Sequence, residues 1–333
     1  MRFKSFIAGG AVLAMYLILE FLRQSGMVNI YWAQIMDLSL IITISAIGLS
    51  LIYGFTGQFS LGHAAFYGIG AYTAGYVTKT YGNSYLLFVL ALIAGTVVAA
   101  GVGYLIGLPI LRLKSDYLGI ATLGFGIIVK VILDNTDHLV PTMGGPRGML
   151  GVPHLTTFAW VFFVAVGVIL LVRNFILSSY GRACTSVRED EIAADIMGID
   201  TTRFKTMAFV MGCGLAGLAG GLYAHLYPFL HPSSFDFLKS LDVLLVVVLG
   251  GLGSLTGTVV TAIAWVFLQE VLRAVLPPDF LDWRGVIYAL VLIVVMIGRP
   301  MGLMGGKELS LDFLFGKKSG TKPGKGASGN ASA

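Results

Sequence analysis

Two glycine-rich stretches contain residues whose types and spacing could bind a small solute. The first covers 54–66 and reads GFTGQFSLGHAAF, and the second covers 249–257 and reads LGGLGSLTG. Each follows an apolar run, so its glycines predict a broken helix whose freed backbone groups pair within the protein or line a solute path. The candidate pathway residues are Gly54, Gly57, Gln58, Ser60, Gly62, His63, Gly250, Gly251, Gly253 and Ser254.

The first stretch also has a plainer interpretation, a tight turn between two helices at a membrane surface. In that interpretation His63 is satisfied by a backbone carbonyl, whereas in the pathway interpretation its side chain meets the solute. Segments 57–61 and 251–255 share the pattern G-x-x-S-L, which hints at an internal duplication of the kind common in transporters. The sequence leaves both interpretations open.

The third candidate is the polar loop 182–205, which reads RACTSVREDEIAADIMGIDTTRFK. Ser186 and Glu189 have the spacing of a capping box, which predicts a helix start, and Gly198 suits the position just past the helix end. Such a short helix, with an apolar edge and mixed charge, either docks into a groove of a partner protein or is a solvated connector. Its residues are Ser186, Val187, Arg188, Glu189, Asp190, Glu191, Ile192, Ala193, Ala194, Asp195, Ile196, Met197 and Gly198.

Several kinds of chemistry have no residues to support them. The sequence contains no G-x-x-x-x-G-K-[ST] loop for ATP phosphates, no CxxC or HExxH motif, and no histidines at metal-ligand spacing. We therefore predict no catalytic residue, no metal and no cofactor bound by this chain. Acidic residues lie toward the ends of the apolar runs, which disfavours coupling to protons or sodium. Any pumping would draw its energy from another subunit.

The composition indicates that helices in a lipid membrane position these candidates. Apolar residues make up 56% of the 333 residues and charged residues only 12%, against about 25% charged in soluble domains. This excludes a soluble enzyme, a disordered chain and a cysteine-stapled secreted domain. The 44 glycines suit close helix packing in lipid. The net charge of +5 is interpreted as orienting membrane segments, with no nucleic-acid partner expected.

The apolar runs predict an all-α integral membrane protein, a polytopic bundle of about eight to ten transmembrane helices with glycine-broken helices. A span needs about 20 residues. Clear runs lie at 6–22, 37–53, 85–109, 116–134, 158–177, 206–227, 255–276 and 286–303, with glycine-interrupted candidates at 61–77 and 240–249. In this arrangement most Lys and Arg residues share the side of the N-terminus, which predicts both termini in the cytoplasm. We expect a transmembrane domain over 1–306 and a disordered basic cytoplasmic tail over 307–333.

Several motifs together resemble those of a known family. They are IGLSLIYGFTGQFSLGHAAFYGIGAYTAGY, LRLKSDYLGIATLGFGIIVKVILDN with GGPRGMLGVP, GRACTSVREDEIAADIMGIDTTRFKTMAFVMGCGLAGLAGGLYAH, FDFLKSLDVLLVVVLGGLGSLTGTVV and RPMGLMG. In this order, over roughly 37–306, the chain resembles the inner-membrane permease subunits of branched-chain amino acid ABC importers, of the LivM type.

The resemblance implies partners and a location that composition does not. The expected partners are a second related permease of the LivH type, two cytoplasmic ATPase subunits that hold ATP and Mg²⁺, membrane lipid, and a periplasmic binding protein that delivers leucine, isoleucine or valine. The expected location is the bacterial inner membrane. The helix over 187–197 would be the coupling helix in a cleft of the ATPase.

Three alternatives remain at the level of the sequence. Permeases of urea and short-chain amide importers share most of these motifs. A self-sufficient secondary carrier or channel would transport without partners, and a structural scaffold would not transport at all.

Overall fold

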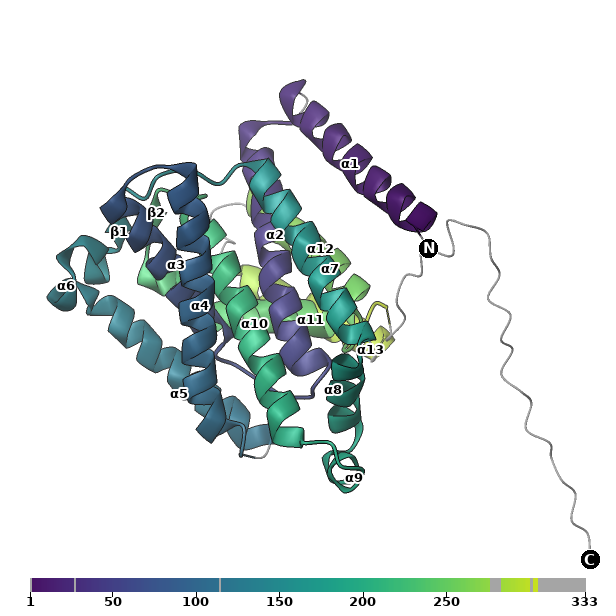
Figure 1. Ribbon diagram of the computed structural model, residues 1–333. Helices are drawn as coiled ribbons and strands as arrows, with labels where there is room; N and C mark the ends of the chain where they lie inside the picture. Colours follow the sequence, from purple (N-terminus) through teal and green to yellow (C-terminus); the bar gives the residue numbers. More distant parts are fainter. Residues whose placement is uncertain (1, 27, 114, 276–282, 300–301, 305–333) are drawn as a thin grey trace, which may run out of the picture.

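Long apolar helices account for most of the described chain (Figure 1). The computed structural model describes residues 2–26, 28–113, 115–275, 283–299 and 302–304, so the predicted tail at 307–333 lies outside them. The helices are α1 (Arg2–Gln24), α2 (Ile30–Leu49) with a π-helical turn (Ser50–Gly54), α3 (His63–Tyr81), α4 (Tyr85–Ile110), α5 (Ser115–Asp134), α6 (Thr136–Leu139), α7 (Phe158–Leu177), α8 (Ser179–Glu189), α9 (Glu191–Ile196), α10 (Thr201–Ala224), α11 (Phe237–Gly250), α12 (Leu255–Val275) and α13 (Arg284–Gly298).

The remaining elements lie at the end of the bundle opposite α8 and α9 (Figure 1). Strands β1 (Met149–Leu150) and β2 (Phe229–Leu230) pair antiparallel, with Met149 opposite Leu230. Short 3₁₀ turns cover Pro141–Met143, Gly145–Arg147 and Pro232–Phe235. These segments join long helices and leave the bundle itself α-helical.

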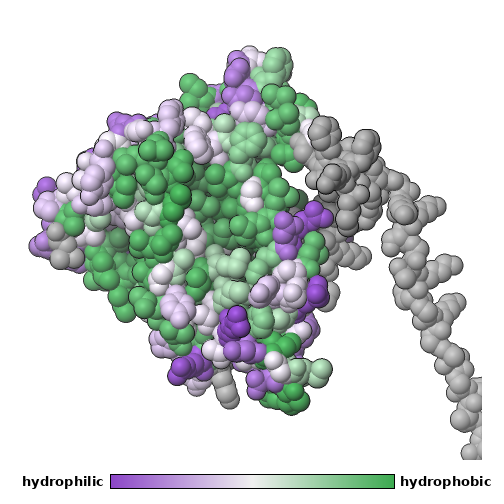
Figure 2. All heavy atoms as spheres, viewed as in Figure 1, coloured by the Kyte–Doolittle hydropathy of each residue, from purple (hydrophilic) through white to green (hydrophobic). Residues whose placement is uncertain are grey.

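Six helices of the described chain are long and apolar enough to cross a membrane. They cover Ile30–Gly54, Tyr85–Ile110, Tyr117–Asp134, Phe158–Leu177, Thr201–Ala224 and Leu255–Val275. Figure 2 shows a broad apolar belt across one face, with hydrophilic residues gathered toward the two ends. The prediction of a polytopic helical membrane protein is confirmed.

The two glycine-interrupted runs correspond to α3, of 19 residues, and α11, of 14 residues. Each of the ten predicted runs falls on one of α1, α2, α3, α4, α5, α7, α10, α11, α12 and α13. Helix α11 has 14 residues, which at 1.5 Å per residue is about 21 Å long, less than the roughly 30 Å of a bilayer core. It ends at Gly250, at the predicted glycine break.

Helices α3, α4 and α10 pack backbone to backbone through glycines. A Cβ at Gly220 would lie 1.9 Å from the carbonyl oxygen of Tyr67, and one at Gly70 would lie 2.1 Å from the carbonyl oxygen of Gly217. No side chain fits at such distances, so the glycines set how closely the helices approach. Close approach gives van der Waals contact, which drives helix association in lipid.

A buried histidine joins the same three helices just past the end of α10. His225 Nδ1 lies 2.7 Å from the carbonyl oxygen of Gly221 and Nε2 lies 2.9 Å from Thr78 Oγ1. The ring meets Phe88 edge to face at 4.9 Å between centroids. The ring thus serves as a structural hydrogen-bonding group that links the end of α10 to α3.

Helix α1 diverges from the other helices and is tied to them near its C-terminal end (Figure 1). Arg23 Nη1 donates a 2.7 Å hydrogen bond to Asp37 Oδ1 of α2, and Nη2 donates at 3.2 Å to Oδ2. The guanidinium also lies 4.6 Å from the ring centroid of Phe158 on α7. A two-pronged ion pair with a cation–π contact is among the stronger polar ties available.

Candidate functional site

The two predicted glycine breaks meet in the structure. The π-helical turn at the end of α2 leads into loop 55–62, and the turn after α11 leads into α12. A Cβ at Gly54 would lie 3.0 Å from the backbone nitrogen of Gly253. Thr258 Oγ1 on α12 donates to Ser50 Oγ at 3.2 Å. Two segments far apart in the sequence thus form one junction at the α8–α9 end of the bundle.

Arg188 of α8 occupies the hollow between these breaks, which we call the glycine notch and define as Gly54, Gly57 and Gly253. Arg188 Nη1 donates a 2.6 Å hydrogen bond to the Gly54 carbonyl. A Cβ at Gly253 would lie 2.7 Å from Arg188 Nη1, and one at Gly57 would lie 3.0 Å from Arg188 Cγ. All three sequence candidates, the two glycine stretches and the polar loop, therefore converge on one side chain.

The predicted capping box at Ser186 is wrong. Helix α8 begins at Ser179 and continues through Ser186, whose hydroxyl donates to the Arg182 carbonyl at 3.0 Å. Ser178 already caps α8, since its Oγ accepts from Gly181 N at 3.4 Å. A serine inside a helix turns its hydroxyl back to the carbonyl four residues earlier, so it gives up the capping role.

The predicted single helix is instead two helices with a break at Asp190. The Asp190 carboxylate accepts from Ile192 N at 2.9 Å and Ala193 N at 3.0 Å, which caps α9. The predicted stop at Gly198 is confirmed. Gly198 has φ +83° and donates its N–H to the Asp195 carbonyl at 2.9 Å, while the N–H of the next residue reaches Ala194 O at 3.0 Å, a Schellman motif.

Helix α9 exposes apolar side chains at a polar end of the molecule. Ile192, Ile196 and Met197 are 74%, 79% and 80% exposed, and we call them the α9 tip. Figure 2 shows an apolar patch at this lower extremity, next to hydrophilic residues. An open groove of about 590 Å³ between α8 and α9 adjoins the tip. Exposed apolar groups rimmed by polar ones are typical of protein interaction sites.

An ion pair, in addition to the Arg188 contact, holds the α8–α9 segment against the bundle. Glu191 Oε2 and Lys205 Nζ form an ion pair at 2.5 Å, which ties α9 to α10. Gln58 Nε2 donates to the Lys205 carbonyl at 3.1 Å, which ties the first glycine stretch to the same place. A small cavity of about 220 Å³ lies between loop 55–62 and α8. The segment is therefore docked on the bundle while its tip stays free.

Cys184 of α8 is fully buried in this docked arrangement, and burial raises the pKa of its thiol to about 11. At pH 8 only about one thiol in a thousand is then the reactive thiolate, against roughly a quarter for an ordinary cysteine. We expect maleimide to label Cys184 about a hundredfold more slowly than an exposed cysteine, with the rate rising toward pH 11. Site-resolved mass spectrometry measures this, with Ser186→Cys as the exposed control. Equal rates at the two positions would contradict the docked arrangement.

His63 begins α3 and is buried, with 1% of its surface exposed. Its Nε2 lies 2.9 Å from the carbonyl oxygen of Ser45 on α2, the kind of partner that the turn interpretation expects. Its Nδ1, Ser60 Oγ and Gln58 Oε1 are buried and have no hydrogen-bond partner among the described residues. The pathway interpretation stays a prediction.

The other predicted residues of the glycine stretches have structural contacts. A Cβ at Gly62 would lie 2.2 Å from the Thr122 carbonyl of α5. One at Gly250 would lie 2.8 Å from the Gly257 carbonyl of α12. Gly251 has φ +107°, and Ser254 Oγ accepts from the N–H of Gly257 at 3.1 Å. These residues shape the turns that build the notch.

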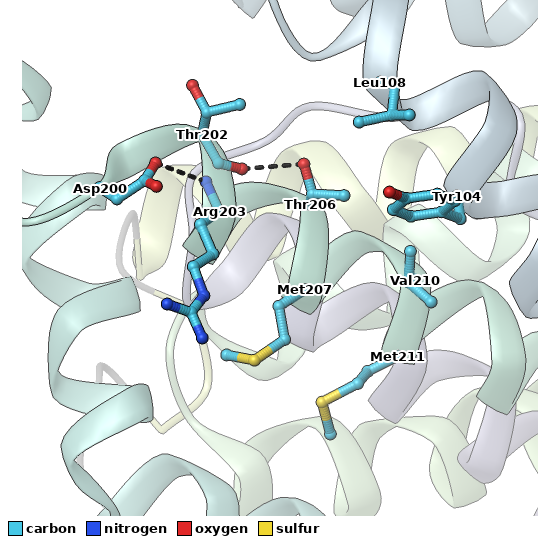
Figure 3. A pocket seen from close by; sticks show the side chains of 9 residues that line it. All are labelled: Tyr104, Leu108, Asp200, Thr202, Arg203, Thr206, Met207, Val210 and Met211. Atoms are coloured by element: carbon cyan, nitrogen blue, oxygen red, sulfur yellow. Dashed lines mark hydrogen bonds between the residues drawn. The ribbon is translucent and has the colours of Figure 1, made fainter.

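A second groove, of about 560 Å³, lies between α4 and α10 and was not anticipated from the sequence. Figure 3 shows Tyr104 and Leu108 on α4 facing Met207 and Val210 on α10, with the guanidinium of Arg203 beside Met207. The signal that could have revealed it is the spacing of methionines on one face of α10, which is also typical of helix packing. Among the described residues no group of three or more His, Cys, Asp or Glu could hold a metal ion.

Comparisons with known proteins agree with one another. Residues 31–296 match a family model described as the permease component of branched-chain amino acid transport systems. The chain is 33% identical to the high-affinity branched-chain amino acid transport system permease protein LivM of Salmonella typhimurium, covering 86% of this chain and 73% of the relative. It is 34% identical to LivM of Escherichia coli, covering 81% and 69%. It is 25% identical to LivH of Salmonella typhimurium, covering 79% and 91%. No solved structure matches.

Proposed function

This chain belongs to the family of permease components of branched-chain amino acid transport systems, and from that premise we propose that it forms part of the membrane path of an ABC importer for leucine, isoleucine and valine. The proposed partners are a second permease of the LivH type, two cytoplasmic ATPase subunits and a periplasmic binding protein. Similarity to proteins named LivM and LivH alike supports a pair of related permeases. The proposed location is the inner membrane, with both termini and the α8–α9 end in the cytoplasm.

The observation that carries this function is the α9 tip. Three large apolar side chains stand in the open while α8 and α9 are docked on the bundle through Arg188 and through Glu191 with Lys205. A free apolar tip on a docked helix pair suits insertion into the groove of a soluble partner. We assign α8 and α9 as the coupling hairpin, which an ATPase grips. ATP binding then moves the hairpin, and the permeases open alternately to the two sides.

The solute path needs only modest polarity, because the proposed substrates carry apolar side chains on a zwitterionic backbone. We assign the path to the neighbourhood of the two glycine stretches, where broken helices expose backbone groups. Ser60 Oγ and His63 Nδ1 are buried and find no hydrogen-bond partner in the part of the chain that the structure describes, which supports this assignment. A buried polar atom without a partner costs free energy, so a transient hydrogen bond from a passing solute offsets that cost.

The proposal is tested by reconstituting the chain in liposomes with the partner permease, the ATPases and the binding protein. We expect uptake of labelled leucine that requires ATP and the binding protein and that stops when ATP is replaced by ADP. Uptake by the chain alone, without ATP, would instead support a secondary carrier or channel. Uptake of urea or acetamide in preference to leucine would support an ABC importer of a different substrate class.

A further inference from the structure

Resting on the proposed function, we propose that Arg188 is the positioning residue through which the coupling hairpin moves both glycine-broken helices at once. Its guanidinium is a clasp between α8 and the glycine notch. Motion of the coupling hairpin would thus reach the bundle at two places, the end of α2 and the turn between α11 and α12.

The first part of the clasp is the hydrogen bond to α2. Gly54 ends the π-helical turn, and the last carbonyls of a helix lack intrahelical N–H partners. Arg188 Nη1 supplies that partner at 2.6 Å. Hydrogen bonds from a charged donor are stronger than neutral ones. A displacement of α8 therefore acts directly on the end of α2 and on the loop that leads to α3.

The second part is contact with the turn between α11 and α12. The space that a Cβ at Gly253 would occupy lies 2.7 Å from Arg188 Nη1 and 3.5 Å from the Gly54 carbonyl. Gly253 has φ +82°, and Gly57 on the other side of the arginine has φ +71°. Any side chain at these positions would meet both backbone strain and the arginine itself. The absence of side chains at Gly253 and Gly57 thus leaves the space that the Arg188 side chain occupies.

Glu189 orients the guanidinium from outside the notch. Its Oε1 accepts from Arg188 Nε at 3.2 Å and from Nη2 at 2.6 Å. With those donors held by the carboxylate, Nη1 is directed toward Gly54. A lysine could carry the charge to the same place, but a single ammonium lacks the planar fork that binds both partners.

The hairpin has an independent anchor, so loss of the clasp uncouples the importer without detaching α9. The Glu191–Lys205 ion pair ties α9 to α10 without Arg188, and buried Cys184 and Val187 pack α8 against the bundle. A variant without the guanidinium is therefore expected to assemble with the ATPases and to hydrolyse ATP. Only the transfer of motion to α2, α11 and α12 is lost.

The test uses the complete importer in proteoliposomes and measures leucine uptake and ATP hydrolysis separately. For Arg188→Gln we expect uptake per ATP to fall about tenfold or more, in line with the loss of a charged hydrogen bond, while basal hydrolysis stays within about twofold of wild type. Arg188→Lys should recover part of the uptake. Arg173→Gln is the matched control, since Arg173 is an exposed arginine on α7, outside the coupling hairpin, and it should behave as wild type.

A second variant keeps the test decisive if Arg188→Gln fails to assemble. Gly253→Ala leaves the arginine in place and should also lower uptake per ATP, and the double variant should be no worse than Arg188→Gln because both changes act on one contact. Normal uptake per ATP in Arg188→Gln, normal uptake per ATP in Gly253→Ala, or multiplying losses in the double variant would each overturn the clasp. If the wild-type importer itself shows no ATP-driven uptake, the proposed function fails instead.

Discussion

Replacing Ile196 with aspartate is expected to abolish ATP-driven uptake, with a loss of about a hundredfold or more. Ile196 is 79% exposed on α9, so the substitution has little effect on the folding of this chain. In the proposed importer the Ile196 side chain would lie in the groove of the ATPase, and an unpaired charge buried there costs several kcal/mol. Co-purification of the ATPases with the permease and uptake in proteoliposomes measure the effect.

The control for this prediction places the same charge at the same end of the molecule. Thr202→Asp lies in the exposed first turn of α10, where a helix N-terminus tolerates a negative charge. This variant should retain its ATPases and its uptake. An Ile196→Asp permease that holds the ATPases and imports as well as the Thr202→Asp control would show that the α9 tip is not the docking surface.

Replacing Gly220 with alanine is expected to destabilise the bundle by about 3 kcal/mol or more, at the upper end of overpacking effects. The added Cβ would lie 1.9 Å from the Tyr67 carbonyl and 2.9 Å from the backbone nitrogen of Ala71. Both atoms belong to the backbone of α3, so no flexible side chain can move aside. Thermal melting of the purified protein in detergent, and the amount recovered from membranes, measure the loss.

Gly214→Ala is the matched control on the same helix. A Cβ there would lie 3.4 Å from the Ala100 side chain, an ordinary contact, and alanine favours a helix over glycine by about 1 kcal/mol. Its melting temperature should equal or exceed that of wild type. Equal melting temperatures for the two variants would show that α3 and α10 do not approach each other as closely as the structure has them.

The membrane helices could be predicted from the sequence because lipid imposes a simple rule on them. Long apolar runs such as 158–177 are necessarily helical where no water can pair the backbone, and α7 covers that run. The break at Gly250 was visible for a similar reason, since α11 ends there. Both features depend on residues close together in the sequence.

The junction could not be predicted, because it depends on contacts between distant segments. Nothing in the sequence around Arg188 indicates that its side chain reaches Gly54, at the end of the π-helical turn, or Gly253, in the turn between α11 and α12. The capping prediction failed for a related reason. Ser186 and Asp190 are both good N-cap residues, and the choice between them follows from the helix that starts upstream at Ser179.

The π-helical turn at Ser50–Gly54 allows the end of α2 to rotate and advance along the helix axis in one discrete step. A π turn holds one more residue than an α turn, so converting it to α geometry would rotate everything after it by about 100° and advance it by about 1.5 Å. That rotation would carry the Gly54 carbonyl around the helix axis and away from Arg188. A change of this one turn between π and α geometry would thus decide whether the Gly54 carbonyl is bonded to Arg188. The rest of α2 would not have to tilt.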